Sequence, residues 1–233
     1  MWKYMVKEKD VIELDLILKD ANTKEMLDTT FPNIAKENNL NIKSEYKPLT
    51  FIVGTGELLK NVEKNIVDLE INKSKTFTLK KAEAFGQRDD KLVTILPLTD
   101  FKKEKINPMP GMYVNISERS ARIVSVSGGR VKVDFNPIFA GRDLEYTITI
   151  NKIFSKDEEK IQPILDKAFS FMPKEQIEYV YDEKLKQVDV QLPLGVPKEL
   201  DYFKQLFAKM VLDSTSLDLV KFSQNFTRKD NNK

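Results

Sequence analysis

The sequence predicts an α+β protein in which a small, mainly β unit interrupts a larger one. Apolar and polar residues alternate in "KDVIELDLILK" (9–19) and "LEYTITI" (144–150), as they do in strands with one buried face. Residues 57–70 predict a helix, because four apolar residues share one face: Leu58, Leu59, Val62 and Ile66. The first pattern stops after Phe85 and Gly86, and it resumes only at "NPIFAGRDLEYTITI" (136–150).

The composition excludes several classes of function. The chain has 233 residues, which is enough for one large domain or for two to three small ones. It has no cysteine and no histidine, so disulfides, thiolate zinc sites and Ser-His-Asp or Cys-His catalysis are excluded. Neither a metal site nor a cofactor is expected. The net charge of +2 does not favour nucleic acid as the main partner.

No membrane association is expected from the sequence. The first residues contain no extended apolar stretch, and no run of about 18 apolar residues could span a bilayer. We therefore expect a cytoplasmic protein.

The first unit reads as strand, loop, strand, helix and strand. After the strand over 9–19, a turn leads to a short extended piece that ends at Asp28. Residues 31–48 are polar and predict a long loop with one helical turn. A short strand at "LTFIVGTGE" precedes the helix, and "KSKTFTLKKAEAF" alternates again as a strand would.

The interrupting segment predicts a small β module. "LPLTDF" (96–101) reads as a helical turn that Thr99 or Asp100 could cap. "ARIVSVSGGRVKVDF" predicts a hairpin, because Gly128 and Gly129 suit the positive φ angles of a tight turn between two alternating arms. The apolar residues of the two arms are Ile123 and Val126, and Val131 and Val133.

The last part of the chain predicts a further α+β unit. It reads as a helix (158–171), a hairpin, a helix with Pro197 in its first turn, and a closing strand, "SLDLVKFSQNFT". That strand carries apolar residues on both faces, and an edge strand of this kind can pair with another chain. The second helix adds a wide apolar face: Leu200, Phe203, Leu206, Phe207 and Met210. We expect a homodimer through this unit; the alternative is that this surface grips clients directly and the protein stays monomeric.

Four segments together resemble one family. "KEMLDTT", "VGTGELLKNVE", "AEAFGQ" and "NPIFAGRDLEYTI" resemble the FKBP class of peptidyl-prolyl isomerases, and most closely its SlyD-type and archaeal long-chain members. In that group a chaperone module, the insert-in-flap domain, interrupts the isomerase domain. The resemblance implies an FKBP-like antiparallel half-barrel sheet wrapped on a short helix. It also implies an isomerase domain of 1–86 plus 136–154, an insert of 87–135 and a C-terminal α+β domain of 155–233.

The resemblance also implies a site. The residues that match the family's catalytic positions are Asp28, Phe85 and Tyr146. Those that match the substrate-binding positions are Leu16, Leu27, Leu49, Leu58, Leu59, Val62 and Phe139. The chain departs from the family pattern at three places: Leu16 replaces a common tyrosine, Val62 replaces a larger residue, and Phe85 replaces a tyrosine and so lacks its hydroxyl.

Such a pocket needs no acid, base or nucleophile. Rotation about an X-Pro bond is opposed by amide resonance, with a barrier of about 18–20 kcal/mol. A dry, apolar cradle favours the twisted amide over the polar planar one. We therefore expect Asp28 to act by hydrogen bonding and through its electric field, and not by proton transfer.

The expected partners are unfolded or nascent proline-containing polypeptides. Seven apolar residues of the insert are candidates for contact with such clients: Leu96, Leu98, Phe101, Ile106, Met109, Met112 and Val114. A module this small cannot hide all of its apolar surface, although about half of these residues should form its core. The predicted function is a prolyl isomerase and folding chaperone. Two alternatives stay open: a holdase with weak residual isomerase activity, and a nucleic-acid-tethered factor that rests only on scattered lysines.

Overall fold

The computed structural model describes residues 4–40, 45–195 and 200–225. They divide into two compact units. The first comprises Met1–Leu18, Met26–Phe77 and Tyr146–Lys233, and the second comprises Lys19–Glu25 and Thr78–Glu145. The domain boundaries that the sequence predicts at 86/87, 135/136 and 154/155 stay predictions.

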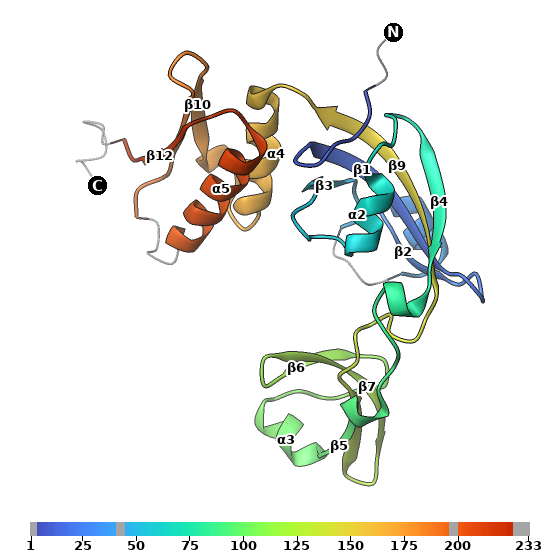
Figure 1. Cartoon of the computed structure of the whole chain (residues 1–233). Helices are drawn as coiled ribbons and strands as arrows, with labels where there is room; N and C mark the ends of the chain where they lie inside the picture. The colour runs from blue at the N-terminus through green and yellow to red at the C-terminus, as the bar shows by residue number, and fades with distance from the viewer. Residues whose placement is uncertain (1–3, 41–44, 196–199, 226–233) are drawn as a thin grey trace. The chain divides into compact units, whose positions relative to one another are not determined.

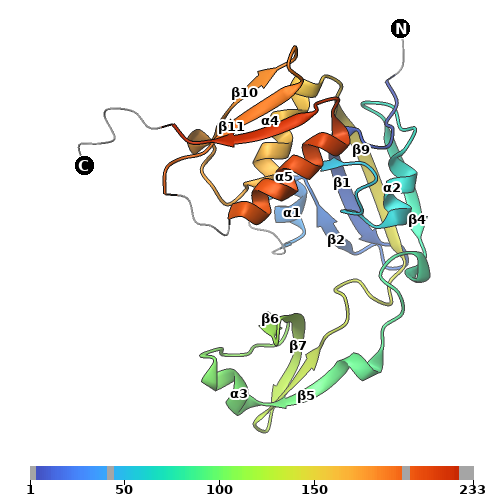
Figure 2. The ribbon, with the colours of Figure 1, turned by 60° about the vertical axis from the view of Figure 1, so that its left-hand side comes forward.

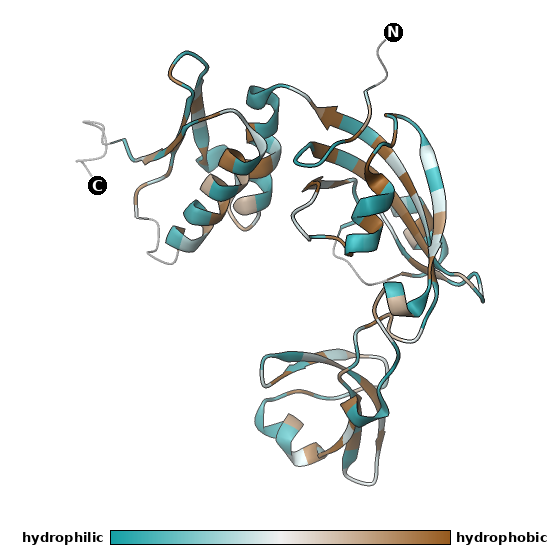
Figure 3. Cartoon of the chain, viewed as in Figure 1, coloured by the Kyte–Doolittle hydropathy of each residue, from teal (hydrophilic) through white to brown (hydrophobic). Residues whose placement is uncertain are grey.

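The first sheet has the strand order β2-β1-β9-β4, and β3 also pairs with β1. Its strands are β1 (Val11–Asp20), β2 (Met26–Thr29), β3 (Leu49–Ile52), β4 (Ser74–Leu79) and β9 (Leu144–Phe154). Side chains alternate between buried and half-buried along β1 and β9, as the sequence predicts, and Figure 3 shows the same alternation of hydropathy. β1 and β3 pair antiparallel, with Leu14 opposite Leu49. The fold is therefore α+β with antiparallel pairing.

Two short helices accompany this sheet. Helix α1 (Pro32–Glu37) supplies the single helical turn expected within 31–48. Helix α2 (Lys60–Ile66) lies beside the curved sheet (Figures 1 and 2) and buries Val62 and Ile66.

Helix α2 is shorter than the predicted helix over 57–70, so that prediction is wrong in its bounds. Leu58 and Leu59 precede the first turn, and Leu59 has extended backbone angles. The cause is a tertiary interaction: the Glu63 carboxylate accepts hydrogen bonds from the backbone N–H groups of Gly54, Gly56 and Leu58, at 3.1, 3.1 and 3.3 Å. These bonds hold residues 54–58 as a loop, because their N–H groups face a carboxylate and not a preceding turn.

The insert forms a sheet with the order β5-β8-β7-β6. Its elements are β5 (Val93–Pro97), α3 (Leu98–Lys103), β6 (Tyr113–Ile116), β7 (Arg119–Ser127) and β8 (Arg130–Asp134). The predicted hairpin is confirmed, with positive φ at Gly128 and Gly129. The register of the two strands shifts between Ile123 and Ser125. As a result Ile123 lies opposite Val133, and Val126 lies opposite Val131.

The predicted cap of the insert helix is wrong. Neither Thr99 nor Asp100 caps α3, because the helix begins at Leu98 and both residues lie inside it; Pro97 is the N-cap residue. The N–H of Leu98 instead donates to the Gly129 carbonyl at 2.9 Å, so the hairpin turn supplies an acceptor to the helix start.

The last part of the chain forms two helices against a three-stranded sheet (Figure 2). Its elements are α4 (Asp157–Ala168), β10 (Glu178–Asp182), β11 (Gln187–Gln191), α5 (Leu200–Ser214) and β12 (Leu219–Ser223). The β10–β11 hairpin is antiparallel as predicted, and β12 pairs parallel with β11 at the edge of the sheet. Helix α4 ends at Ala168, three residues before its predicted end. Pro197 lies outside the described residues.

One buried cluster joins this part to the first sheet within the first unit. Val11, Ile52 and Phe154 belong to the same cluster as residues of α4 and α5, such as Ile164 and Phe207. Among the described residues, no helix is long and apolar enough to span a lipid bilayer.

The three hydrogen bonds to Glu63 give a prediction about stability. Glu63→Ala leaves three partly buried N–H groups without this acceptor, and we expect a loss of roughly 1–3 kcal/mol in the free energy of unfolding. Glu63→Gln keeps the shape and one acceptor oxygen, so its loss should be smaller. Urea unfolding of both variants checks this. An Ala variant within about 0.5 kcal/mol of wild type would show that the loop does not depend on the carboxylate.

Candidate functional site

Asp28 and Tyr146 lie on two strands that flank β1. Asp28 is near the end of β2 and is half-buried, and Tyr146 is on β9 and is buried. Burial, and to a lesser extent the negative charge of Asp28, together raise the pKa of the Tyr146 phenol to about 12. The phenol of Tyr146 is therefore neutral at pH 7 and lies within the electric field of the Asp28 carboxylate.

Two threonines fix the end of β2 against β1. Thr29 Oγ1 donates to the Leu16 carbonyl at 3.1 Å, and Thr30 Oγ1 accepts from the Leu16 N–H at 3.0 Å. Thr30 Oγ1 also donates to Asp15 Oδ1 at 2.6 Å. The Thr29 N–H donates to Asp28 Oδ1 at 2.7 Å, so the Asp28 carboxylate is held by the residue that anchors the strand.

An aromatic stack supports Tyr146 from β4. The Phe77 ring lies 5.5 Å from the Tyr146 ring, centroid to centroid, at an interplanar angle of 10°. Hydroxyl pairs Thr76–Thr147 (2.9 Å) and Ser74–Thr149 (2.7 Å) fix the register of β4 and β9, which puts Phe77 directly across from Tyr146. Phe77 was not among the predicted site residues; the alternation of "KTFTL" indicated its face but not its partner.

The apolar residues predicted for this wall fall into two groups. Leu16, Leu27 and Val62 are buried, at 8%, 5% and 2% exposure. They can therefore support a binding surface from beneath but have little area to contact a ligand. Leu58 and Leu59, just before α2, are half-buried and remain accessible. The loop that carries Leu58 is the one that Glu63 holds.

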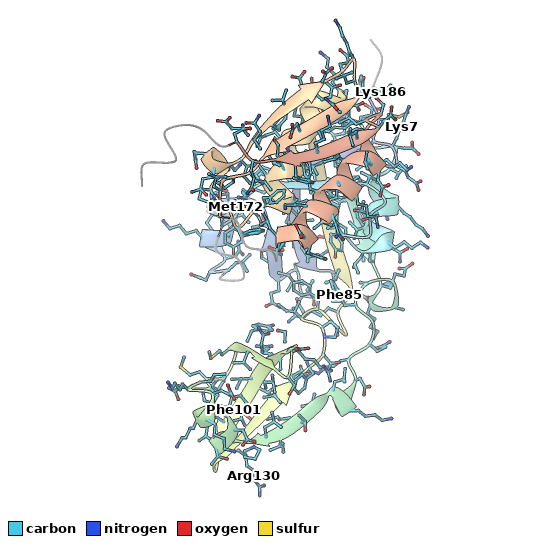
Figure 4. All side chains as sticks on the ribbon, turned by 90° about the vertical axis from the view of Figure 1, so that its left-hand side faces the viewer. Lys7, Phe85, Phe101, Arg130, Met172 and Lys186 are labelled. Carbon is cyan, nitrogen blue, oxygen red and sulfur yellow. The ribbon has the colours of Figure 1, made fainter. Side chains whose placement is uncertain are left out.

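Leu49 lines a cavity beside α4, away from the wall around Tyr146. It lines a space of about 600 Å³ together with residues of β3, of α4 and of the segment that follows α4, among them Thr50, Leu165, Phe169 and Met172 (Figure 4 labels Met172). Lys167 donates to the Thr50 carbonyl at 3.2 Å at this cavity and pairs with Glu57. The assignment of Leu49 to the prolyl pocket stays a prediction.

Phe85 and Phe139 lie in the second unit, where they contact one another. Their rings are 5.6 Å apart, at an edge-to-face angle of 66°. The N–H of Gly141 donates to the Gly86 carbonyl at 2.8 Å, so the chain segments on either side of residues 87–135 meet beside this pair. Phe85 is labelled in Figure 4, and it is half-buried. Its role in catalysis and that of Phe139 in binding stay predictions.

The seven client-binding candidates of the insert separate by burial. Phe101 (Figure 4) and Val114 form part of the insert core. Leu96, Leu98 and Ile106 pack against that core and are partly buried. Met109 and Met112 are 59% and 38% exposed. The structure adds three exposed apolar residues that the sequence did not single out: Ile95, Tyr113 and Val124.

The pKa of Tyr146 gives a prediction about alkaline pH. The phenol has a pKa of about 12 in the fold and about 10 when unfolded. The stability that depends on its neutral form is therefore present below pH 10 and is lost as the pH rises from 10 through 12. Tyr146→Phe should remove this loss. A difference titration of phenolate absorbance between wild type and Tyr146→Phe should show one tyrosine titrating near pH 12; titration near pH 10 would mean that the phenol is not buried beside Asp28.

Comparisons with known proteins identify the family of the chain. A family model described as "FKBP26, IF domain" matches residues 94–137. The chain is 31% identical over 156 residues to the short-type peptidyl-prolyl cis-trans isomerase of Methanocaldococcus jannaschii, covering 66% of this chain and 98% of that protein. It is 22% identical over 159 residues to the FKBP-type peptidyl-prolyl cis-trans isomerase SlyD of Helicobacter pylori, covering 67% of this chain and 78% of that protein. The chain belongs to the FKBP-type peptidyl-prolyl cis-trans isomerases.

Proposed function

We propose that the wall formed by Asp28, Tyr146 and the Leu58–Leu59 loop holds an X-Pro bond of an unfolded polypeptide and favours its twisted form. The observation that carries this proposal is the buried Tyr146 phenol, stacked on Phe77 and within the field of Asp28. A planar amide has a larger charge separation than a twisted one, so an apolar wall disfavours the planar ground state. Bond rotation then needs no proton transfer.

Asp28 and Tyr146 have separate roles in this proposal. The Tyr146 phenol stays protonated at pH 7 and is a hydrogen-bond donor there. The Asp28 carboxylate accepts the Thr29 N–H and carries charge at the edge of an otherwise apolar wall. Because neither group has to change its protonation state, turnover should not show a bell-shaped pH profile between pH 6 and 9.

We also propose that the insert binds unfolded chains. Five side chains on it are apolar or aromatic and at least one-third exposed: Ile95, Met109, Met112, Tyr113 and Val124. Exposed methionines adapt to many partner shapes, and exposed apolar residues are candidates for contact with an unfolded chain. In the holdase alternative, the insert and the C-terminal part do the useful work and the pocket turns over little. The rate on short peptides separates this alternative from the proposal. Dimerisation through the C-terminal part, and a cytoplasmic location, stay predictions.

One experiment tests the division of labour between pocket and insert. Residues 87–135 are replaced by a short loop, and Asp28→Ala is made in the full chain. Each form is measured on a proline tetrapeptide and on an unfolded protein whose refolding is limited by proline isomerisation. The loop variant should keep its tetrapeptide rate and lose most of its effect on refolding, because the insert raises the local concentration of unfolded chain.

Asp28→Ala should lower both rates severalfold. An unchanged tetrapeptide rate in Asp28→Ala would move the active site elsewhere. Equal losses on both substrates in the loop variant would mean that the insert is not a separate client-binding module.

A further inference from the structure

The two chain segments that connect the insert to the rest of the protein run side by side and are joined by hydrogen bonds and an ion pair. The outgoing segment is 86–92 and the returning segment is 134–141. The Gly141 N–H donates to the Gly86 carbonyl at 2.8 Å, and the Phe135 N–H donates to the Leu92 carbonyl at 3.0 Å. Between these two backbone bonds lies a group of polar side chains on Arg88, Asp89, Asp134 and Asn136, called here the crossing clamp.

Asp134 is the buried member of the crossing clamp. Its carboxylate is 7% exposed and accepts three groups: Arg88 Nη2 at 2.7 Å, and the backbone N–H and side-chain Nδ2 of Asn136 at 3.0 and 2.7 Å. A buried carboxylate needs such partners, because an unpaired charge away from water is costly. The ion pair therefore joins the outgoing segment to the returning one.

The side-chain amide of Asn136 bonds the backbone of Asp89 as a neighbouring strand would. Its side-chain oxygen accepts the Asp89 N–H at 2.9 Å, and its Nδ2 donates to the Asp89 carbonyl at 2.9 Å. One side-chain amide thus makes with the backbone of residue 89 the two bonds that a paired strand residue would make. The geometry requires an amide, since one atom must accept and the other must donate.

We propose that the crossing clamp is a positioning device that makes the insert effective in presenting a bound chain to the isomerase pocket; this rests on the proposed function. Without these hydrogen bonds and this ion pair, residues 86–92 and 134–141 act as two flexible linkers. The effective concentration of the bound chain at the pocket falls as such linkers lengthen. The clamp residues are positioning residues, because the hydrogen bonds and the ion pair of their side chains join the two connecting segments to one another.

The sharpest test changes one group. Asn136→Asp keeps the shape of the side chain but replaces its donor with an acceptor, opposite both the Asp134 carboxylate and the Asp89 carbonyl. Asn115→Asp is the matched control, because Asn115 is an exposed asparagine on β6 of the same insert and the change in charge is the same. Arg88→Ala is the second variant, and Arg88→Lys restores its charge.

All variants are made in the full chain and measured for KM and kcat on a tetrapeptide and on a proline-limited unfolded protein. Hydrogen exchange of the Asp89 and Gly141 amides reports opening of the clamp. We expect Asn136→Asp and Arg88→Ala to raise KM for the unfolded protein roughly 3–10-fold and to leave kcat and the tetrapeptide rate within about twofold. Asn115→Asp should match wild type, and Arg88→Lys should recover most of the loss.

Several results would overturn the proposal. One is an unchanged KM for the unfolded protein while amide exchange shows an open clamp. Another is an unfolded insert in both variants, because the clamp would then serve folding and not positioning. If the loop variant that lacks 87–135 refolds the protein as well as wild type, the proposed role of the insert fails as well. If the loop variant loses this effect but the clamp variants do not, only the positioning role fails.

Discussion

The structure depends on the strand β9, which the chain can form only after it has returned from the insert. β9 lies between β1 and β4, so the sheet has no continuous core until this strand is in place. The same strand brings Tyr146 between Asp28 on one side and Phe77 on the other. The close approach of Gly86 and Gly141 shortens the path between β4 and β9, because it closes the insert as a loop at its base.

The wall around Tyr146 and the insert are supported by separate interactions. The wall around Tyr146 is built from strand pairings and threonine hydroxyls that lie outside the insert. The insert has its own core of six buried residues, including Phe101 and Ile123. Because each part buries its own apolar residues, a change in the exposed surface of the insert need not disturb the wall around Tyr146.

Sequence patterns predicted the elements whose folding is local. Alternation in β1 and β9 and the paired glycines of the β7–β8 hairpin needed no knowledge of distant residues. The patterns failed where a hydrogen bond that apolar periodicity does not encode decided the start of a helix. The start of α2 was placed too early because Glu63 captures three N–H groups of the preceding loop, and the cap of α3 was misplaced because the Gly129 carbonyl accepts from the Leu98 N–H.

The site was predicted only in part for the same reason. Asp28 and Tyr146 were named from family motifs, and the structure brings them together. Phe77 could not be found that way, because its role comes from the register of β4 against β9. Leu49 was assigned to the pocket from the resemblance to the family, and the structure places it at the cavity beside α4. The crossing clamp was not predicted, although Asn136 begins the motif "NPIFAGRDLEYTI", because Arg88, Asp134 and Asn136 are ordinary polar residues until the two segments meet.

The central claim is that the wall at Asp28 and Tyr146 is where prolyl bonds rotate. The most direct measurement is NMR exchange spectroscopy of a proline tetrapeptide with a small amount of protein, combined with the backbone amide shifts of the protein as peptide is added. We predict cis–trans exchange cross-peaks that weaken in Asp28→Ala, and amide shift changes centred on Asp28, Leu58, Leu59 and Tyr146. Full exchange in Asp28→Ala, with shift changes confined to Leu49, Phe169 and Met172, would place the active site at the cavity beside α4. That result would contradict a role of Asp28 and Tyr146 in prolyl rotation.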